Sequence, residues 1–198
     1  MSSQLGETML NSGADGELVD QLRAGAPEAL SELFELYGDR IHTHCFRRLG
    51  SWHEAEDATA SVFLEVWRHR ERVRLHDESA LPWLYGVATN VCRNAARGAR
   101  RRLRLVGRLP DPAAEDDHSE AVAARVDAEA RMGRVLAAID ALPEREREVL
   151  ALVAWAGLTY EQAAVALDVP VGTIRSRLSR ARGRLSLTDP DAEGAPDA

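Results

Sequence analysis

The sequence contains no lysine, only two cysteines, and few aromatic residues, which make up 5% of its 198 positions. The cysteines, Cys45 and Cys92, are too few for a disulfide framework or a four-ligand zinc site, so we expect two reduced thiols buried in helices. No apolar run approaches the ~20 residues that a membrane-spanning helix needs. The first residues also lack the basic start and apolar stretch of a secretory signal. We therefore expect a cytoplasmic protein without membrane insertion.

Motifs of the common enzyme classes are missing as well. The six histidines include no HExxH pair, and the sequence has neither a GxxxxGK[ST] phosphate-binding loop nor a GxSxG nucleophile motif. His42 and His44 are two residues apart, which places them on different faces of a helix and argues against metal chelation. We expect no enzymatic activity, no metal and no cofactor.

The net charge of −7 averages over blocks of opposite sign. Residues 41–108 carry 13 basic and 7 acidic groups, residues 109–130 carry 1 and 7, and residues 171–185 carry five arginines and no acid. Two separated basic blocks indicate two contacts with a polyanion such as nucleic acid. All 25 basic residues are arginine, which fits phosphate and guanine contacts but follows equally from a genome-wide bias in base composition.

Alanine, leucine and valine are abundant and recur at helical spacing, which predicts an all-α protein. Residues 1–16 are polar and are expected to be disordered. Residues 17–106 should form a first domain, with helices that begin at Pro27, at a capping-box pattern from Ser51, and near Leu81. On a helical wheel, the last of these helices has a stripe of arginines opposite its apolar face.

A second small domain follows an acidic segment. Residues 107–127, with two prolines, are predicted to be a linker and the start of the next helix. Residues 128–186 should form the second domain, and residues 187–198 a disordered acidic tail. A capping-box pattern at residues 159–162, a turn at Pro170 and a basic last helix together predict a helix-turn-helix. The predicted fold is therefore all-α: two small helical domains joined by an acidic flexible linker, the second a helix-turn-helix.

The last predicted helix has one apolar and one basic face. Ile174, Leu178 and Ala181 lie on the apolar side, and arginines with small hydroxyl side chains lie opposite. Arginine can reach guanine edges and phosphates, while serine and threonine are short enough for close approach. The exposed face therefore suits the major groove of DNA.

At this point the chain resembles the sigma-70 family of bacterial RNA polymerase sigma factors. The segments that resemble region 4 are Leu-Pro-Glu-Arg-Glu-Arg-Glu-Val-Leu at 142–150, Gly-Leu-Thr-Tyr-Glu-Gln-Ala-Ala at 157–164 and Val-Gly-Thr-Ile-Arg-Ser-Arg-Leu-Ser-Arg-Ala-Arg at 171–182. The segment from Ala55 to Trp67 resembles region 2.2, and the segment from Trp83 resembles regions 2.3 and 2.4. Only a short linker stands in place of region 3, as in the extracytoplasmic-function (ECF) class.

The resemblance implies a subunit that binds core RNA polymerase and directs it to promoter DNA. In the family, the first domain binds the β′ clamp helices and opens the −10 element, and the second binds the −35 element and the β flap. The residues that match the polymerase-facing helix are Glu56, Asp57, Phe63 and Trp67, of which Phe63 is favoured as a core residue. Those that match the −10 region are Trp83, Asn90, Arg93, Asn94, Arg97 and Arg100. Those that match the −35 helix are Thr173, Arg175, Ser176, Arg177 and Arg180. The loop at residues 71–80 matches the place where the family captures a flipped −10 base.

The sequence departs from the family at Ala60 and Ser61, where a glutamine followed by an acid is usual, and this removes polar contacts expected with the polymerase. Many ECF factors are held by an anti-sigma factor, and such a partner is open here. The main alternative is a stand-alone helix-turn-helix transcriptional regulator, which would not need the region 2-like segments. An interaction module that only sequesters other regulators is a further alternative, and the exposed arginine faces argue against it.

Overall fold

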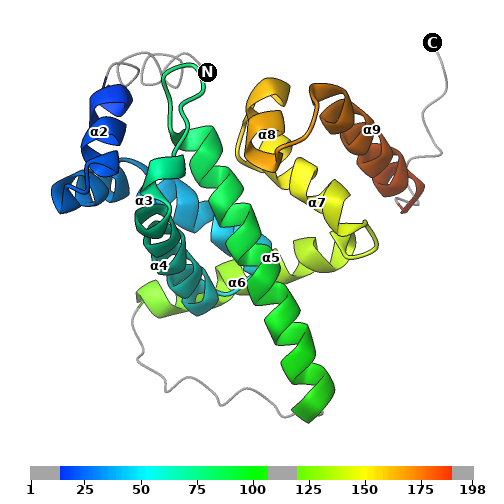
Figure 1. Ribbon diagram of the computed structural model, residues 1–198. Coiled ribbons are helices and arrows are strands. Elements are labelled where there is room, and N and C mark those ends of the chain that lie inside the picture. The colour runs from blue at the N-terminus through cyan, green and yellow to red at the C-terminus, as the bar shows by residue number, and fades with distance from the viewer. Residues whose placement is uncertain (1–13, 107–119, 189–198) are drawn as a thin grey trace.

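The computed structural model describes residues 14–106 and 120–188, and the regular elements in these ranges are helices. They are α2 (Ala14–Arg23), α3 (Pro27–Leu49), α4 (Trp52–Arg68), the 3-10 turn η1 (Arg70–Arg72), α5 (Leu81–Val106), α6 (Glu120–Ile139), α7 (Glu144–Leu150), the π-helical turn η2 (Ala151–Trp155), α8 (Tyr160–Leu167) and α9 (Val171–Thr188). The all-α prediction is confirmed (Figure 1). The predictions for residues 1–13, 107–119 and 189–198 lie outside the described residues.

Helix α2 begins at Ala14, inside the segment 1–16 that was predicted to be disordered. The reason is Asp15, which is only 1% exposed. Its Oδ2 accepts hydrogen bonds from the Tyr37 hydroxyl and from the Ala80 amide, the latter at 2.9 Å. A buried carboxylate with two donors ties this short polar segment to α3 and to the start of α5.

Helices α3, α4 and α5 pack into the first domain, with α2 at one end (Figure 1). Gly50 ends α3 in the left-handed conformation at φ 77°, which glycine adopts without strain. Ser51 then caps α4 by accepting a hydrogen bond from the Glu54 amide at 3.4 Å, so the serine half of the predicted capping box is formed. The largest fully buried apolar side chains of this domain include Leu22, Leu33, Ile41, Val62, Val66 and Leu84.

The titratable side chains inside this core include a histidine and two cysteines. The His44 ring faces the Thr89 hydroxyl at 3.4 Å and the Tyr85 ring at 5.1 Å, and burial next to two arginines lowers the pKa of His44 to about 3. Cys45 and Cys92 are both free and buried, as predicted. Their mutual hydrogen bond and burial raise the pKa of the Cys92 thiol, so this pair behaves as part of the apolar core.

The second domain ends in the predicted helix-turn-helix. Thr159 caps α8 with a complete capping box: its Oγ1 accepts a hydrogen bond from the Gln162 amide at 3.1 Å, and Gln162 Oε1 accepts one from the Thr159 amide at 3.0 Å. Asp168 ends α8 with φ 51° in the left-handed region, and α9 starts after Pro170. Helix α9 continues to Thr188, two residues into the predicted tail.

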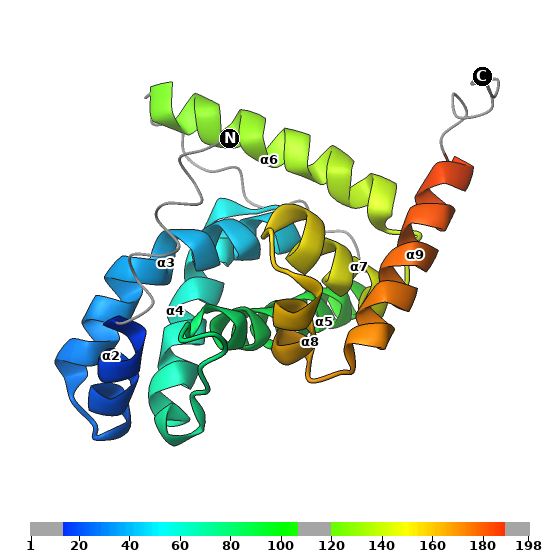
Figure 2. The same ribbon diagram turned by 90° about the horizontal axis from the view of Figure 1, so that it is seen from above.

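The two helical domains pack against each other, which the sequence analysis did not anticipate. Helices α7 and α8 lie beside α5 in Figure 1, and α6 runs across α3 in Figure 2. Buried residues of both domains, such as Ala88 and Leu152, belong to one continuous apolar core. Arg47 of α3 donates a hydrogen bond to the Trp155 carbonyl oxygen at 2.6 Å. The amide of Trp52 donates one to the Glu129 carboxylate at 2.7 Å.

Candidate nucleic-acid and polymerase interfaces

Helix α9 carries the residues predicted to read the −35 element. Its apolar residues Ile174 and Leu178 are buried against the rest of the helix-turn-helix, which turns the opposite face outward. On that face Arg175, Ser176 and Arg180 are exposed, and Thr173 and Arg177 are half-buried. Three of the five predicted residues are therefore exposed on α9, and the other two are half-buried.

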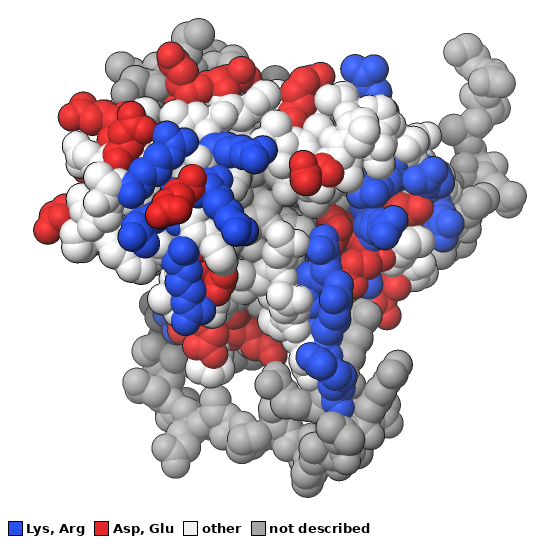
Figure 3. Space-filling model, in the orientation of Figure 1, with Lys and Arg blue, Asp and Glu red and all other residues white. Residues whose placement is uncertain are grey.

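Two interactions orient the arginines of α9. The Arg175 guanidinium lies 6.0 Å from the centre of the Tyr160 ring at the start of α8. Glu146 of α7 is buried, and its two carboxylate oxygens lie 3.3 Å from Nε of Arg180 and of Arg184 respectively. Figure 3 shows blue basic side chains gathered on the right of the molecule, with red acidic atoms among them. Sequence reasoning missed Glu146, although the alternation of glutamate and arginine in α7 was a visible signal.

Helix α5 presents a second basic surface, which forms a column of blue over its lower half in Figure 3. Asn90, Asn94 and Arg97 are exposed on α5. The side chain of Arg100 lies outside the described residues. This surface and the basic face of α9 appear in the same view, so one face of the molecule carries both.

Arg93 does not point into solvent, where the helical wheel had placed it. Its Nε and Nη2 each lie 2.6 Å from one carboxylate oxygen of Glu148 in α7, and its Nη1 lies 3.0 Å from Oδ1 of Asn90. The Glu148 side chain is 2% exposed, so Arg93 is the counter-ion that a buried carboxylate requires. The wheel of α5 alone could not show this contact, because Glu148 comes from the other domain.

Trp83 is half-buried and lines a groove between α4 and α5. The polar residues on the two walls are Ser61 and Glu65 from α4, His69 directly after α4, and Asn90 and Asn94 from α5. The groove joins the predicted −10 surface of α5 to the predicted polymerase-facing side of α4. An aromatic ring beside amides is the kind of environment that holds an unstacked base.

The predicted polymerase-facing residues of α4 divide into two groups. Glu56 and Asp57 are exposed, as are Ala60 and Ser61, so the departure from the family pattern lies on the surface. Phe63 is different: it is 5% exposed and packs edge-on against Phe34 at 4.9 Å between ring centres. Phe63 therefore belongs to the core and cannot itself face a partner, because the α3 contact covers its ring.

Sequence reasoning also missed the apolar part of this surface. Phe34 and Leu64 are each 48% exposed, on the neighbouring helices α3 and α4. Trp67 is half-buried, and the Arg70 guanidinium lies 5.1 Å above its ring. The α4 surface thus combines carboxylates at its N-terminal end with apolar and aromatic groups toward its C-terminal end.

A third basic cluster lies at the end of α4 and around η1. Arg23, Arg68, Arg72 and Arg74 are exposed there. The cluster appears as the blue group on the left of Figure 3. Arg23 also donates a hydrogen bond to the Val73 carbonyl oxygen at 2.7 Å, which holds the start of the 71–80 loop against α2. The positive charge of residues 41–108 was the sequence signal for the last three of these arginines, but it did not show where on the surface they would lie.

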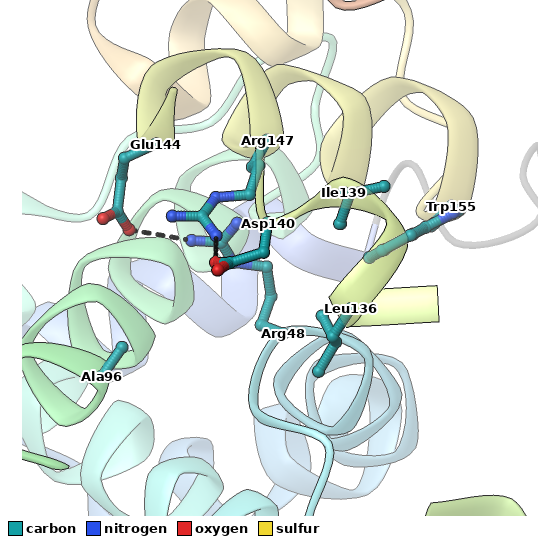
Figure 4. A pocket seen from close by; sticks show the side chains of 8 residues that line it. All are labelled: Arg48, Ala96, Leu136, Ile139, Asp140, Glu144, Arg147 and Trp155. Atoms are coloured by element: carbon teal, nitrogen blue, oxygen red, sulfur yellow. Dashed lines mark hydrogen bonds and ion pairs between the residues drawn. The ribbon is translucent and has the colours of Figure 1, made fainter. Parts of the chain in front are cut away.

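A pocket at the junction of the two domains is lined by charged pairs (Figure 4). Arg48 points toward Glu144, with 3.4 Å between Nη2 and Oε1, and Arg147 points toward Asp140, with 2.6 Å between Nη1 and Oδ1. Each arginine is paired with a carboxylate within the pocket. We therefore interpret the pocket as part of the contact between the two domains and not as a ligand site. In the part of the chain that the structure describes, no cluster of three or more histidine, cysteine or acidic side chains could hold a metal. None of the described helices is long and apolar enough to cross a membrane.

Both helical domains match known protein families. Residues 33–102 match the family described as sigma-70 region 2, and residues 132–185 match sigma-70 region 4. The chain is 32% identical to the RNA polymerase sigma-H factor of Pseudomonas aeruginosa over 183 residues, which cover 88% of this chain and 93% of that protein. It is 31% identical to the ECF RNA polymerase sigma factor SigD of Mycobacterium bovis, covering 85% and 80%. The chain belongs to the ECF class of the sigma-70 family.

Other relatives of this sigma factor agree in class and in fold. It is 33% identical to the ECF sigma factor SigE of Mycolicibacterium smegmatis, but the match spans 78% of this chain and 59% of that longer protein. Among solved structures, CnrH in complex with the cytosolic domain of CnrY has a TM-score of 0.64 at 24% identity, covering 90% of this chain and 99% of that one. The sigma factor RpoE of Bartonella quintana, in complex with the anti-sigma factor NepR, has a TM-score of 0.57 at 21% identity, covering 79% and 94%. These two structures share the helical fold of this chain.

Proposed function

We propose that this sigma factor binds core RNA polymerase and directs it to promoters, with α5 at the −10 element and α9 at the −35 element. The observation that carries the proposal is that one face of the molecule bears two basic helix surfaces, one in each domain (Figure 3). Each helix is anchored by a buried apolar side, so its polar side is held outward as a unit. Two rigid basic surfaces suit two separated segments of one DNA molecule.

At the −35 element, α9 enters the major groove as the recognition helix. Arg175 and Arg177 contact guanine edges or phosphates, and Ser176 and Thr173 allow the helix to approach the bases closely. Arg180 lies about two turns along α9 from Thr173, held by Glu146, and is placed to contact the phosphate backbone. Glu146 pairs with two arginines, so these three side chains keep a net positive charge that attracts DNA.

At the −10 element, α5 and the adjoining groove receive the opened strand. Asn90, Asn94 and Arg97 supply hydrogen-bond donors along α5, and Arg93 lies on the same stripe. Trp83 lines the groove and offers a surface on which an unstacked base can rest. The arginines around η1 extend the positive surface past the 71–80 loop, where a single strand's backbone would continue.

The partner of α4 is core RNA polymerase. Glu56 and Asp57 provide charged contacts, and Phe34, Leu64 and Trp67 provide apolar ones, for the β′ clamp helices of the polymerase. Aromatic and apolar groups rimmed by charge are typical of interface centres. Ala60 and Ser61 offer no charged contact, so we place more of the binding energy on the apolar residues. The second domain would contact the β flap. We further propose an anti-sigma factor as a partner, since RpoE of B. quintana is bound to one in its solved structure.

The proposal is tested by transcription in vitro with purified bacterial core polymerase on a library of templates with randomised upstream sequence. We expect the added protein to enrich transcripts from templates that share two spaced motifs. Arg175→Ala should relax selection at one position of the upstream motif, whereas Arg134→Ala, an exposed arginine of α6, should leave both motifs unchanged. Absence of any enriched motif, together with specific duplex binding by the protein alone, would favour a stand-alone helix-turn-helix regulator.

A further inference from the structure

Two thiols that the proposed function does not use lie together inside the first domain. Cys45 in α3 and Cys92 in α5 are 0% and 1% exposed, and the sequence has no other cysteine. Helices α3 and α5 pack against each other, and both thiols belong to the same apolar core. Although they are distant in the sequence, the Cys45 and Cys92 side chains form a hydrogen bond. The fold therefore brings the two sulfur atoms into contact.

This hydrogen bond makes the two thiols chemically unequal. The bond with Cys92, followed by one with Thr59, lowers the pKa of the Cys45 thiol although burial opposes the shift. The same bond, together with burial, raises the pKa of the Cys92 thiol. Cys45 is thus the sulfur that forms a thiolate, the nucleophilic form of cysteine, while Cys92 keeps its proton. A reactive thiol next to a protonated one is the arrangement in which the second thiol can complete an oxidation begun at the first.

We propose that Cys45 and Cys92 are a modification site: a peroxide oxidises them to a reversible disulfide that links α3 to α5. The inference goes beyond the proposed function and does not depend on it, because it concerns the core of the first domain. The link would join α5, whose outer side carries the surface proposed for the −10 element, covalently to α3.

The reaction consists of two balanced steps. The Cys45 sulfur attacks one oxygen of hydrogen peroxide, the O–O bond breaks, and Cys45 becomes a sulfenic acid while the other oxygen leaves as water with the thiol proton. The Cys92 sulfur then attacks the sulfenic sulfur, the S–O bond breaks, and the hydroxyl group leaves as a second water with the Cys92 proton. The two thiols lose two hydrogens and two electrons, and one peroxide is reduced to two waters.

The position of the pair determines both its access and its effect. Hydrogen peroxide is small and uncharged, so brief local opening of the core is enough to admit it. A disulfide holds its sulfurs about 2.05 Å apart, which two sulfurs already in contact reach by a small movement of their side chains. The bond closes a long loop of chain between α3 and α5 and so restricts the unfolded state. We expect the oxidised protein to be more stable than the reduced one.

Peptide mapping of the full-length protein tests the site directly, because two cysteines allow only one intramolecular disulfide. The reduced protein is treated with hydrogen peroxide, then with catalase, and is unfolded in guanidinium with N-ethylmaleimide before digestion without reductant. Trypsin cleaves after arginine, so residues 41–47 carry Cys45 and residues 75–93 carry Cys92. We expect these two peptides to be joined, with a mass two hydrogens below their sum, and to separate when dithiothreitol is added.

Single substitutions test the order of the two steps. In Cys92→Ala, oxidation should stop at the sulfenic acid of Cys45, which dimedone traps on residues 41–47. In Cys45→Ala, the remaining Cys92 thiol should stay reduced at the same peroxide concentration. Circular dichroism verifies that each variant is folded, and the peptide map of the unsubstituted protein decides the proposal if one of them is not. Equal trapping by dimedone in the two variants would contradict the assignment of Cys45 as the first sulfur oxidised.

Thermal melting measures the effect of the link. Peroxide should raise the melting temperature of the unsubstituted protein by about 5 °C or more, and dithiothreitol should reverse the rise. Cys92→Ala is the matched control, because it keeps Cys45 and cannot form the link, and its melting temperature should not rise. An equal or lower melting temperature of the oxidised unsubstituted protein would contradict the stabilising effect.

Three products of the peptide map would overturn the disulfide. Maleimide on both cysteines after peroxide treatment would show that the core shields the thiols from the oxidant. A sulfinic acid on Cys45 beside an unmodified Cys92 would show that the two sulfurs cannot close the bond. Disulfides between two copies of the chain would show that the thiols react only after the core has unfolded.

Discussion

Arg93 of α5 and Glu148 of α7 form an ion pair with two contacts of 2.6 Å, and it joins the surface proposed for the −10 element to the domain proposed for the −35 element. Glu148 is almost fully buried while the Arg93 side chain is 27% exposed. Loss of the arginine would leave the carboxylate buried and unpaired, whereas loss of the carboxylate would leave an arginine that water can still reach. The stability of the second domain is consequently linked to the first.

The first prediction concerns this linkage. Because the apolar cores of the two domains are continuous, calorimetry of the unsubstituted protein should show one cooperative transition with equal calorimetric and van't Hoff enthalpies. Glu148→Gln should separate it into two, with the second domain melting roughly 4–8 °C lower for each 1 kcal/mol of lost coupling. Glu161→Gln, at an exposed position of α8, is the control and should retain one transition. Two transitions already present in the unsubstituted protein would contradict the linkage.

The second prediction concerns the buried carboxylate of Asp15 at the beginning of α2. Asp15→Ala leaves the Tyr37 hydroxyl and the Ala80 amide without their acceptor, so it should lower the free energy of unfolding by about 2–3 kcal/mol. Asp20→Ala removes only an exposed pair with Arg23 and should cost less than about 1 kcal/mol. Urea denaturation measures both. Equal stability of the two variants would mean that residues 14–16 do not contribute to the folded domain.

The third prediction is a loss of stability in mild acid. The pKa of His44 falls to about 3 in the folded protein, against about 6.5 in an unfolded chain. Between these values the unfolded chain binds a proton that the folded protein does not, so the free energy of unfolding decreases as pH falls below about 6.5. From pH 7 to about 5.5 the loss from this group is about 1 kcal/mol. His44→Gln should remove that portion of the pH dependence, and an unchanged pH profile in this variant would contradict it.

The fourth prediction concerns base or phosphate contact by α9. Arg177→Ala should weaken use of a cognate promoter by about 1–3 kcal/mol if Arg177 reads a base. Transcription with core polymerase from the motif selected in vitro measures the effect. Arg145→Ala, an exposed arginine of α7, is the matched control and should transcribe normally. Transcription by Arg177→Ala at the control level would remove Arg177 from the recognition surface.

Local sequence patterns were sufficient for the helices and for the helix-turn-helix. The predicted starts at Pro27 and Leu81 agree with the structure, and the predicted capping box at residues 159–162 is formed in full. These features depend on residues within a few positions of one another. The same holds for the outward face of α9, since helical periodicity alone separates Ile174 and Leu178 from the polar residues.

Contacts between distant segments were not predictable in this way. The backbone of Ala166 in α8 packs against Gly86 of α5, where a Cβ atom would overlap it, and no local pattern shows that this helical glycine is needed for close packing. Arg93 was expected to be solvated, because a helical wheel of α5 does not include Glu148 of α7. Asp15 was predicted to be disordered, because its two hydrogen-bond donors come from distant parts of the chain, in α3 and directly before α5. Buried polar pairs between distant residues can be identified only once the tertiary structure is known.

The central claim is that this chain is a polymerase subunit, and gel filtration with bacterial core RNA polymerase tests it most directly. At about 0.15 M salt, where exposed charges are screened beyond ~8 Å, we predict that the full-length protein elutes with core polymerase. Leu64→Asp, on the exposed surface of α4, should elute alone, and Val126→Asp, on the exposed side of α6, should still co-elute. Elution of the unsubstituted protein apart from core polymerase would contradict the account.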